Sequence, residues 1–296
     1  MMESMNKVKI SDLPSIAKTL LIPLSYRIAD NRRPDPMVKD PHVLELADRI
    51  EDDVAKFAKD QGFDTIFGMM RVRQFDKYAQ TFLDMYPNGI IVDLGCGLDT
   101  RHDRIDNGQM EWYGVDLPEV IEFRTQLLPE TQRSQIIGCS ALDFTWIETI
   151  LKPNKAAYLF LAEGLLPYFA KTDVKRLVLK LKEHFPGSEL IFDVVSRFHI
   201  QLHSLRSSNR KITSLLQWSP ENIREIEAWD EEIRLLSIWN YFDKYEPRLG
   251  IFNSLKFIPF LRGISLILRY RLGGLVKDRE VNHEPLELNN ALYNKD

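Results

Sequence analysis

Residues 90–100 constrain the fold of this 296-residue chain more than any other stretch. They read Ile-Ile-Val-Asp-Leu-Gly-Cys-Gly-Leu-Asp-Thr, an apolar run that meets an acid and then Gly95 and Gly97. This pattern is typical of a buried parallel strand that leads into a tight glycine turn, where open α/β sheets bind nucleotides. A second apolar run ends on Asp116, and an acid at that place is suited to binding ribose hydroxyls. The two runs together predict a site for a nucleoside cofactor.

The spacing of the glycines distinguishes between nucleoside cofactors. A dinucleotide fold places a third glycine at the sixth position of the loop, where this chain has Thr100. Asp93, close before Gly95, suits a ligand with positive charge and disfavours a pyrophosphate at a helix N-terminus. S-adenosylmethionine carries a sulfonium and an ammonium, so the loop favours methyl transfer over hydride transfer with NAD. A strand-to-helix turn that binds no ligand is the simpler alternative.

Composition narrows the classes of function. A hydrophobic content of 44% supports a sizeable core, and a formal net charge of −4 provides no basic excess for nucleic-acid binding. The two cysteines, Cys96 and Cys139, and the six histidines show no metal-ligand spacing, so we expect no metal. Because the sequence shows neither a disulfide framework nor a signal peptide, we expect a cytoplasmic protein.

Residues 255–276 are apolar enough to raise the question of a membrane segment. Arg262, Arg269 and Arg271 interrupt the run, and no stretch reaches the ~18 uncharged apolar residues that a spanning helix needs. The period-two alternation over residues 268–272 is typical of a strand. We therefore predict a late strand and no stable membrane insertion, with a surface-lying amphipathic segment as the alternative.

The chain is predicted to form a single domain over residues 1–296. We expect a helical N-terminal cap (1–85), a cofactor-binding core (86–195), and a substrate-side insertion with the last strands (196–296). Neither an internal repeat nor an interdomain linker interrupts this order.

Alternating strands and helices define the fold class as α/β. In the cap, a helix is expected to begin at its N-cap Asp40 and to end at Gly62. A second helical stretch ends before Pro87. The expected strands lie near residues 90–94, 111–116, 135–139, 157–162 and 188–194, and the clearest helix is 172–185. This alternation implies a mostly parallel sheet with helices on both faces.

These motifs resemble the leucine carboxyl methyltransferase family, and within it the bacterial branch of tetracenomycin-type polyketide O-methyltransferases. The resemblance rests on residues 92–101, 112–120 and 162–168, with support from 18–24 and 185–193. It implies a class I S-adenosylmethionine-dependent methyltransferase, a Rossmann-like fold with a seven-stranded, mostly parallel sheet. The chain departs from the branch at Pro167, where methionine is common, beside Tyr168.

The resemblance also implies which residues hold the cofactor. An arginine would bind the methionyl carboxylate, glycines would admit the methionine end, an acid would bind the ribose, and a neighbouring pair would frame the adenine. In that order, these residues are Arg71; Gly95 and Gly97; Asp116; and Asp143 with Phe144. The cofactor-binding set further includes Asp93, Leu117 and Glu163.

Tyr168 and Glu163 are the expected catalytic residues. A carboxylate acceptor is already ionised at neutral pH, whereas a phenol, with a pKa near 10, needs a general base. Tyr168 would then orient the acceptor, with Glu163 or a histidine of residues 199–203 as the base. The aromatic residues Trp218, Trp229, Trp239 and Phe242 suit either a flat apolar acceptor or core packing.

Structural roles compete with several of these assignments. A solvated helix surface is the alternative for Arg71 and the favoured interpretation for Arg73, and Asp143 is also compatible with an N-cap. Asp99 and Arg101 are expected to form an ion pair that shapes the glycine loop.

The predicted function is S-adenosylmethionine-dependent O-methylation of a small, apolar or aromatic metabolite, with a carboxylate oxygen favoured over a phenol. The alternatives are a protein C-terminal carboxyl methyltransferase, a non-catalytic S-adenosylmethionine-binding sensor or scaffold, and an NAD-dependent oxidoreductase. The oligomeric state is not predicted.

Overall fold

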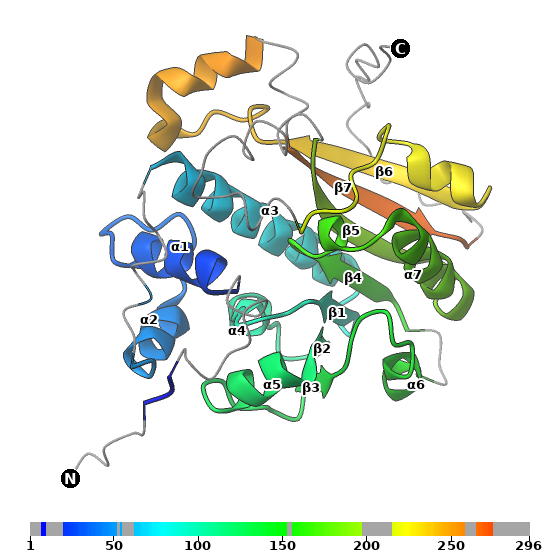
Figure 1. The fold of residues 1–296 in the computed structure, drawn as a ribbon, viewed down its shortest axis with the longest axis horizontal. Coiled ribbons are helices and arrows are strands. Elements are labelled where there is room, and N and C mark those ends of the chain that lie inside the picture. The colour runs from blue at the N-terminus through cyan, green and yellow to red at the C-terminus, as the bar shows by residue number, and fades with distance from the viewer. Residues whose placement is uncertain are drawn as a thin grey trace. The chain divides into compact units, whose positions relative to one another are not determined.

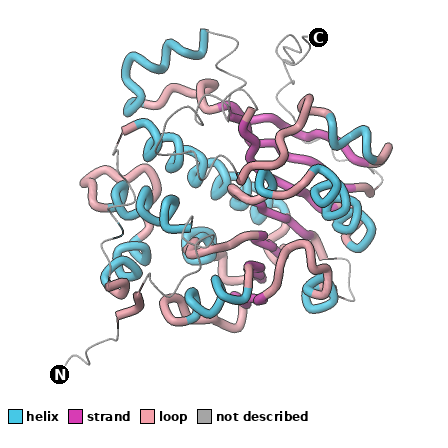
Figure 2. Tube along the Cα trace, viewed as in Figure 1, coloured by secondary structure: helices cyan, strands magenta, loops and turns pink. Residues whose placement is uncertain are grey.

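Strands alternate with helices along the chain, as the sequence predicts (Figures 1 and 2). The computed structural model describes residues 7–9, 20–51, 54, 62–152, 156–196, 215–257 and 265–274. Its contacts divide the chain into two compact units, Met1–Trp146 and Ile147–Asp296. The described strands follow the order β3-β2-β1-β4-β5-β7-β6 in a seven-stranded mixed sheet, the topology expected for a class I methyltransferase fold.

The first unit begins with helices and continues with three parallel strands. Its elements are α1 (Leu21–Asn31), α2 (Pro41–Asp48), α3 (Phe63–Met85), β1 (Ile90–Leu94), α4 (Arg101–Ile105), β2 (Glu111–Asp116), α5 (Pro118–Thr125) and β3 (Ser134–Gly138); α6 (Trp146–Ile150) begins at its last residue. Strand β1 pairs with β2 in the register Val92 to Tyr113. Strand β2 in turn pairs with β3 in the register Gly114 to Ile136. All five residues of β1 are buried, as expected for a strand covered on both faces.

The second unit contains the remaining four strands. Its elements are β4 (Tyr158–Ala162), the 3₁₀ turn η4 (Leu166–Tyr168), α7 (Lys171–His184), β5 (Ser188–Val195), the 3₁₀ turn η5 (Glu225–Trp229), β6 (Ile233–Asn240), η6 (Pro247–Phe257) and β7 (Ser265–Leu272). Strands β4 and β5 are parallel, whereas β7 runs antiparallel to both β5 and β6. The predicted late strand at 268–272 is thus confirmed as part of β7.

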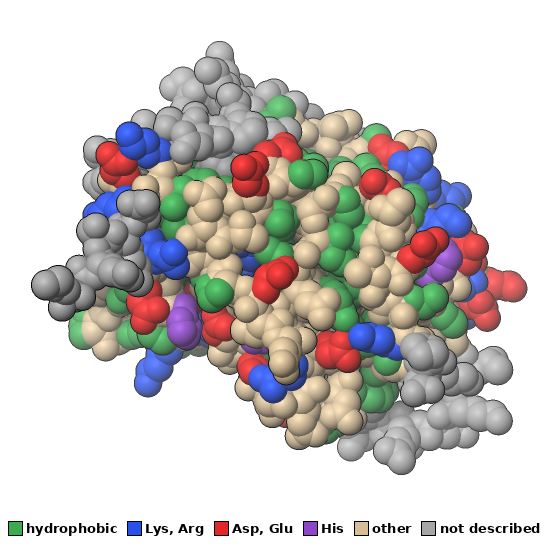
Figure 3. All heavy atoms as spheres, turned by 90° about the horizontal axis from the view of Figure 1, so that it is seen from below, with side chains coloured by type: hydrophobic (Ala, Val, Ile, Leu, Met, Phe, Trp, Pro, Cys, Tyr) green, Lys and Arg blue, Asp and Glu red, His purple; other side chains and the backbone are tan. Residues whose placement is uncertain are grey.

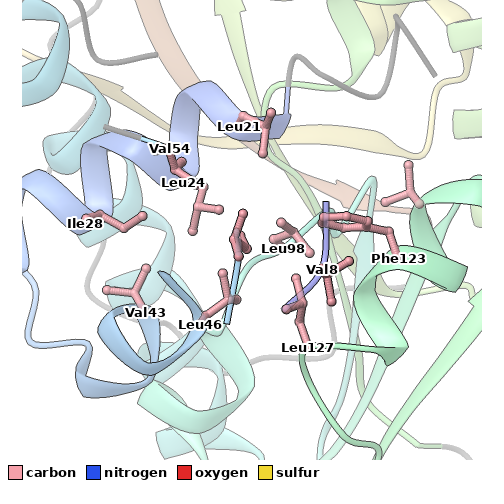
Figure 4. Close-up of a cluster of buried hydrophobic side chains, with 12 residues drawn as sticks. Val8, Leu21, Leu24, Ile28, Val43, Leu46, Val54, Leu98, Phe123 and Leu127 are labelled. Atoms are coloured by element: carbon pink, nitrogen blue, oxygen red, sulfur yellow. The ribbon is translucent and has the colours of Figure 1, made fainter. Parts of the chain in front are cut away.

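A buried apolar cluster joins the N-terminal helices to the glycine loop and α5 (Figure 4). Leu24 and Ile28 of α1 and Leu46 of α2 pack with Leu98 of the loop and Phe123 of α5. Each such side chain contributes about 1.5–3 kcal/mol by burial. The loop therefore rests on helices that come from distant parts of the sequence.

The helix expected between Asp40 and Gly62 is wrong in extent. Asp40 does cap α2, accepting from the Val43 amide at 3.2 Å, but the helix ends at Asp48. Ile50 then forms a parallel β-bridge with Val8. Ile50 is buried in either arrangement, so its spacing from earlier apolar residues did not reveal the end of the helix.

Gly62 is also placed differently from the prediction. It precedes α3 as that helix's N-cap residue rather than ending α2. The second helical stretch, predicted to end before Pro87, is confirmed as α3, and its Phe75, Ala79 and Phe82 are buried.

Acidic and basic side chains are interspersed on the face drawn in Figure 3. None of the described helices combines the length and apolar character needed to cross a bilayer.

Candidate cofactor site

The loop after β1 has the backbone that its glycines predict. Gly95 and Gly97 have φ angles of 72° and 47°, in the left-handed region that favours glycine. The Gly95 amide donates to the Val115 carbonyl at 2.7 Å, which ties the loop to β2. Among the described residues, a Cβ atom at Gly97 would meet only Leu20 Cβ within 4 Å, at 3.7 Å. The backbone at Gly97 is therefore accessible for close approach.

Asp116 lies at the end of β2 and contacts this loop directly. Its Oδ2 accepts from the Gly97 amide and its Oδ1 from the Leu117 amide, both at 2.7 Å. Burial raises the pKa of Asp116, although these two amide bonds oppose the shift. Each carboxylate oxygen keeps acceptor capacity beyond one bond, so the group can also receive ribose hydroxyls. The structure thus brings Asp116 and the glycine loop together, and their contact with the cofactor remains a prediction.

Asp93 has an internal partner. Its side chain is buried, and its Oδ2 accepts from Arg101 Nη1 at 2.9 Å. Arg101 thus neutralises the carboxylate that the sequence suggested as a counter-charge for a cationic ligand. Asp93 fixes Arg101 rather than offering an uncompensated charge, and any contact with the cofactor remains a prediction.

Asp99 is held by three arginines. Its carboxylate lies 3.1 Å from Arg101 Nη1, 3.0 Å from Arg104 Nη1 and 3.2 Å from Arg27 Nη1. Burial alone would raise the pKa of Asp99, but the three guanidinium groups outweigh it and hold that pKa well below its ordinary value. The predicted Asp99–Arg101 ion pair is confirmed as one part of a larger network.

The side chain of Thr100 has a structural role at the position where a dinucleotide fold has its third glycine. Its hydroxyl accepts from Arg27 Nη1 and Arg104 Nη1, each at 2.9 Å, and donates to Asp40 Oδ2 at 2.6 Å. Arg104 also donates to both oxygens of Asp76 on α3. The position that a dinucleotide fold leaves without a side chain is here a polar junction.

Arg124 of α5 holds the other side of the loop. Its Nη1 donates to the carbonyls of Gly97 and Asp99, both at 2.8 Å. The guanidinium group lies over the Trp112 ring, 5.3 Å from its centroid. Arg124 therefore fixes the loop through its backbone.

Sequence reasoning did not place Arg27, Asp76, Arg104 or Arg124 in this network, and it predicted Asp40 only as a helix N-cap. Only Arg104 left a signal, because it follows Arg101 by three residues and so shares its helix face. The other residues converge through tertiary structure.

Arg71 lies half-buried on α3, and Arg73 on the same helix is exposed. Close to Arg71 is Tyr26 of α1, whose ring packs against Gly68. The pKa of Tyr26 is raised to about 12, first by burial and then by the charge of Asp64, with Arg71 acting in the opposite direction. Arg71 thus lies beside α1, and its contact with the cofactor remains a prediction.

Asp143 and Phe144 follow β3 just before α6. Asp143 is exposed, and its Oδ1 accepts from the Thr145 amide at 3.3 Å and hydroxyl at 3.0 Å. These bonds close a local turn, and because α6 begins only at Trp146, Asp143 does not precede the helix directly as an N-cap residue would. Phe144 is half-buried. Their role in framing the adenine remains a prediction.

The turn after β4 carries Glu163 and Tyr168, both half-buried. Gly164 has a φ of 66°, and its amide donates to the buried carboxylate of Asp193 on β5. This contact fixes the backbone directly after Glu163.

Residues 217 and 218 hold the far end of the same turn. The Pro167 carbonyl accepts from the amides of Gln217 at 2.7 Å and Trp218 at 3.1 Å. The side-chain amide of Gln217 donates to the Tyr168 carbonyl at 2.8 Å. Pro167, the departure from the branch pattern, thus takes part in fixing the backbone at Tyr168.

Comparison with known proteins identifies the family. A model of the leucine carboxyl methyltransferase family matches residues 21–182. The tetracenomycin polyketide synthesis O-methyltransferase TcmP of Streptomyces glaucescens is 31% identical over 270 residues, which cover 87% of this chain and 97% of that protein. The chain belongs to the leucine carboxyl methyltransferase family.

Further relatives agree with this assignment. The S-adenosyl-L-methionine-dependent methyltransferase dpfgK of Gibberella zeae is 28% identical over 246 residues, covering 76% of this chain and 82% of that protein. The crystal structure of a DUF574 family protein from Streptomyces avermitilis has a TM-score of 0.54 at 16% identity, covering 84% of this chain and 97% of the other, and supports the fold alone. This leucine carboxyl methyltransferase family member is an S-adenosylmethionine-dependent methyltransferase.

The residues of the first unit fit this cofactor. Gly97 leaves room for close backbone approach, and Asp116 keeps acceptor capacity for hydroxyl groups. The loop between them is already fixed by Arg124 and by the ion pairs of Asp99. A cofactor at this loop would therefore meet a backbone that is already held in place.

The structure also shows where the aromatic residues and one histidine lie. Trp218 and Trp239 are buried, and Trp218 lies 6.0 Å from Phe192 between ring centroids, whereas Trp229 and Phe242 are half-buried. Their contact with an acceptor remains a prediction. His102 is also buried, with Nδ1 3.1 Å from Asp103 Oδ1. Residues 199–203, which include the histidines considered as bases, lie outside the described residues.

Proposed function

We propose that this methyltransferase transfers a methyl group to an oxygen atom of a small apolar or aromatic metabolite, with a carboxylate as the favoured acceptor. The observation that carries the proposal is the 31% identity, over 87% of this chain, to a polyketide synthesis O-methyltransferase. The family description, which names a carboxyl group, supports a carboxylate oxygen.

In this proposal the first unit binds the cofactor from several directions. Arg71 binds the methionyl carboxylate, and Asp116 accepts the ribose hydroxyls. Asp143 and Phe144 frame the adenine. Asp116 is suited to its role because both of its oxygens are already oriented by backbone amides, which preorganises the carboxylate.

The bound cofactor supplies an electrophilic sulfonium methyl group. The acceptor oxygen forms a bond to the methyl carbon as the carbon–sulfur bond breaks, and S-adenosylhomocysteine leaves with the bonding electrons. The protein aligns the two groups and excludes water. Glu163 binds on the cofactor side, and Tyr168 donates a hydrogen bond that orients the acceptor.

The acceptor decides whether a base is needed. A metabolite carboxylate reacts without proton transfer, whereas a phenol transfers its proton to Glu163. A carboxylate acceptor therefore predicts a turnover number that changes little over the neutral pH range. A phenol acceptor predicts turnover that rises with pH.

Calorimetric titration with S-adenosylhomocysteine, with NAD as the parallel control, tests the cofactor site. Saturable binding of the homocysteine compound alone supports the proposal, and binding of NAD alone would favour the oxidoreductase alternative. Mass spectrometry of reactions with aromatic carboxylic acids, phenols and peptides with free C-termini then identifies the acceptor class. Methylation of peptides alone would replace the metabolite with a protein C-terminus, and binding without turnover would favour a sensor.

A further inference from the structure

Helix α1 contacts two parts of the proposed cofactor site through adjacent residues. Tyr26 packs against α3 at Gly68, one turn before Arg71. Arg27 inserts into the glycine loop with its side chain almost completely buried. The two side chains are neighbours in sequence, so the helix backbone rigidly links the places they contact.

Arg27 contacts the glycine loop through hydrogen bonds as well as through an ion pair. Its Nη2 donates to the Leu98 carbonyl at 2.7 Å, and its Nη1 reaches Asp99 Oδ1 at 3.2 Å and Thr100 Oγ1 at 2.9 Å. Three consecutive loop residues are thus held by one guanidinium group. Arg27 also lies 3.4 Å from Asp40 Oδ2, and Asp40 caps α2.

The contact of Tyr26 with α3 is equally close. A Cβ atom on Gly68 would lie 2.6 Å from Tyr26 Cδ2, so only glycine lets the ring lie against the helix at this position. The ring also lies near the charge of Arg71. This close contact therefore fixes the distance between α1 and the part of α3 that carries Arg71.

From these contacts we infer that α1 sets the separation between Arg71 and the glycine loop, with Arg27 as a positioning residue for the methionine end of the cofactor. The inference rests on the proposed function, in which Arg71 and the loop hold that end. Arg27 acts through the loop and not by touching the cofactor. Asp116 accepts from the Leu117 amide outside the loop as well as from the Gly97 amide within it, so the ribose end depends less on Arg27.

Two ligands that differ only at the methionine end test this inference. S-adenosylhomocysteine has the amino-acid portion, and 5′-methylthioadenosine lacks it but keeps the ribose and adenine. In Arg27→Lys the charge stays, but an ammonium group cannot reproduce the planar fork that holds three loop residues. We expect roughly tenfold weaker binding of S-adenosylhomocysteine and unchanged binding of 5′-methylthioadenosine. Arg32→Lys, at the exposed end of α1, is the matched control and should bind both ligands as wild type does.

A second variant tests the other contact without altering a charge. Gly68→Ala forces the Tyr26 ring away from α3 and should weaken S-adenosylhomocysteine binding selectively, whereas in a Tyr26→Ala background it should have no further effect. Gln80→Ala, at an exposed position of the same helix, is its control and should bind S-adenosylhomocysteine as wild type does.

Equal loss of both ligands in Arg27→Lys and Gly68→Ala, or no loss of either, would overturn the inference. Wild-type protein that binds neither ligand would instead refute the proposed function and, with it, the role of α1.

Discussion

The loop after β1 and the turn after β4 are both held by contacts from distant residues, but with different chemistry. Four arginines fix residues 97–101 through buried carboxylates and carbonyls. The turn that carries Glu163 and Tyr168 is held by backbone amides, one buried carboxylate and one side-chain amide. The first arrangement depends on paired charges, whereas the contacts described for the second are hydrogen bonds to or from the backbone.

This difference predicts which of the two segments tolerates substitution. A buried ion pair that loses one partner leaves an uncompensated charge and costs about 3–5 kcal/mol. A lost neutral hydrogen bond costs only about 0.5–1.5 kcal/mol. The glycine loop should therefore be rigid and intolerant of substitution, and the turn at Tyr168 should adapt more readily.

The largest effect is expected for Arg101→Met, which removes a cation paired with both Asp93 and Asp99. We expect a loss of about 3–5 kcal/mol in the free energy of unfolding, measured by urea denaturation. Arg32→Met, on the exposed end of α1, is the control and should change stability little. A loss below about 1 kcal/mol for Arg101→Met would show that the network is not the main support of the loop.

Cofactor contacts should give the next largest effect. Asp116→Ala and Arg71→Ala should each weaken S-adenosylhomocysteine binding by roughly tenfold to a hundredfold, since each removes a charged hydrogen-bond partner worth about 1.5–3 kcal/mol. Calorimetry measures the affinity, and thermal unfolding checks that the fold is retained. Arg73→Ala, on the exposed face of α3, should bind like wild type. Wild-type affinity in both site variants would rule out this cofactor site.

The pKa shifts of Asp99 and Asp116 have opposite signs, and this opposition predicts a pH dependence. Burial raises the pKa of Asp116, so this carboxylate takes up a proton at a higher pH than the ~3.9 of an ordinary aspartate. Asp99, with its lowered pKa, stabilises the fold above that ordinary value and loses this contribution only as the pH falls toward its own pKa. As pH decreases toward 4, cofactor affinity should therefore fall before stability does.

Titration of S-adenosylhomocysteine across this range, beside denaturation at the same pH values, checks the order of events. Asp116→Asn has no carboxylate to titrate and should lose the affinity change. If affinity and stability fall together in the wild type, loss of the fold rather than protonation of Asp116 explains the pH effect.

The sequence predicted the parts of the site that depend on local pattern. The strands around the loop were placed within a residue of their observed bounds, and the left-handed Gly95 and Gly97 and the approach of Asp116 followed from the same motif. The strand β6 was missed. The bulge between Leu235 and Ser237 breaks its alternation, so the period-two signal is lost.

Local sequence patterns could not predict the arginine network. Arg27 meets the loop only because the apolar faces of α1 and α2 pack over Leu98, and no spacing in the sequence encodes that convergence. The same holds for the turn after β4, where Asp193 accepts from the Gly164 amide and Gln217 donates to the Tyr168 carbonyl.

The smallest effect is expected at that turn. Gln217→Ala removes the side-chain bond to the Tyr168 carbonyl but keeps the backbone amide bond of residue 217 to Pro167. Because Gln217 is exposed, the stability loss should stay below about 1 kcal/mol, and S-adenosylhomocysteine affinity should not change. Turnover of the identified acceptor should fall severalfold if Tyr168 orients it, since a small displacement of a positioned group lowers the rate. Gln80→Ala, at an exposed position of α3, is the control. Unchanged turnover in Gln217→Ala would have two explanations: the Pro167 contacts alone fix the turn, or Tyr168 does not orient the acceptor. Tyr168→Phe separates them, because removing the hydroxyl lowers turnover only if Tyr168 orients the acceptor.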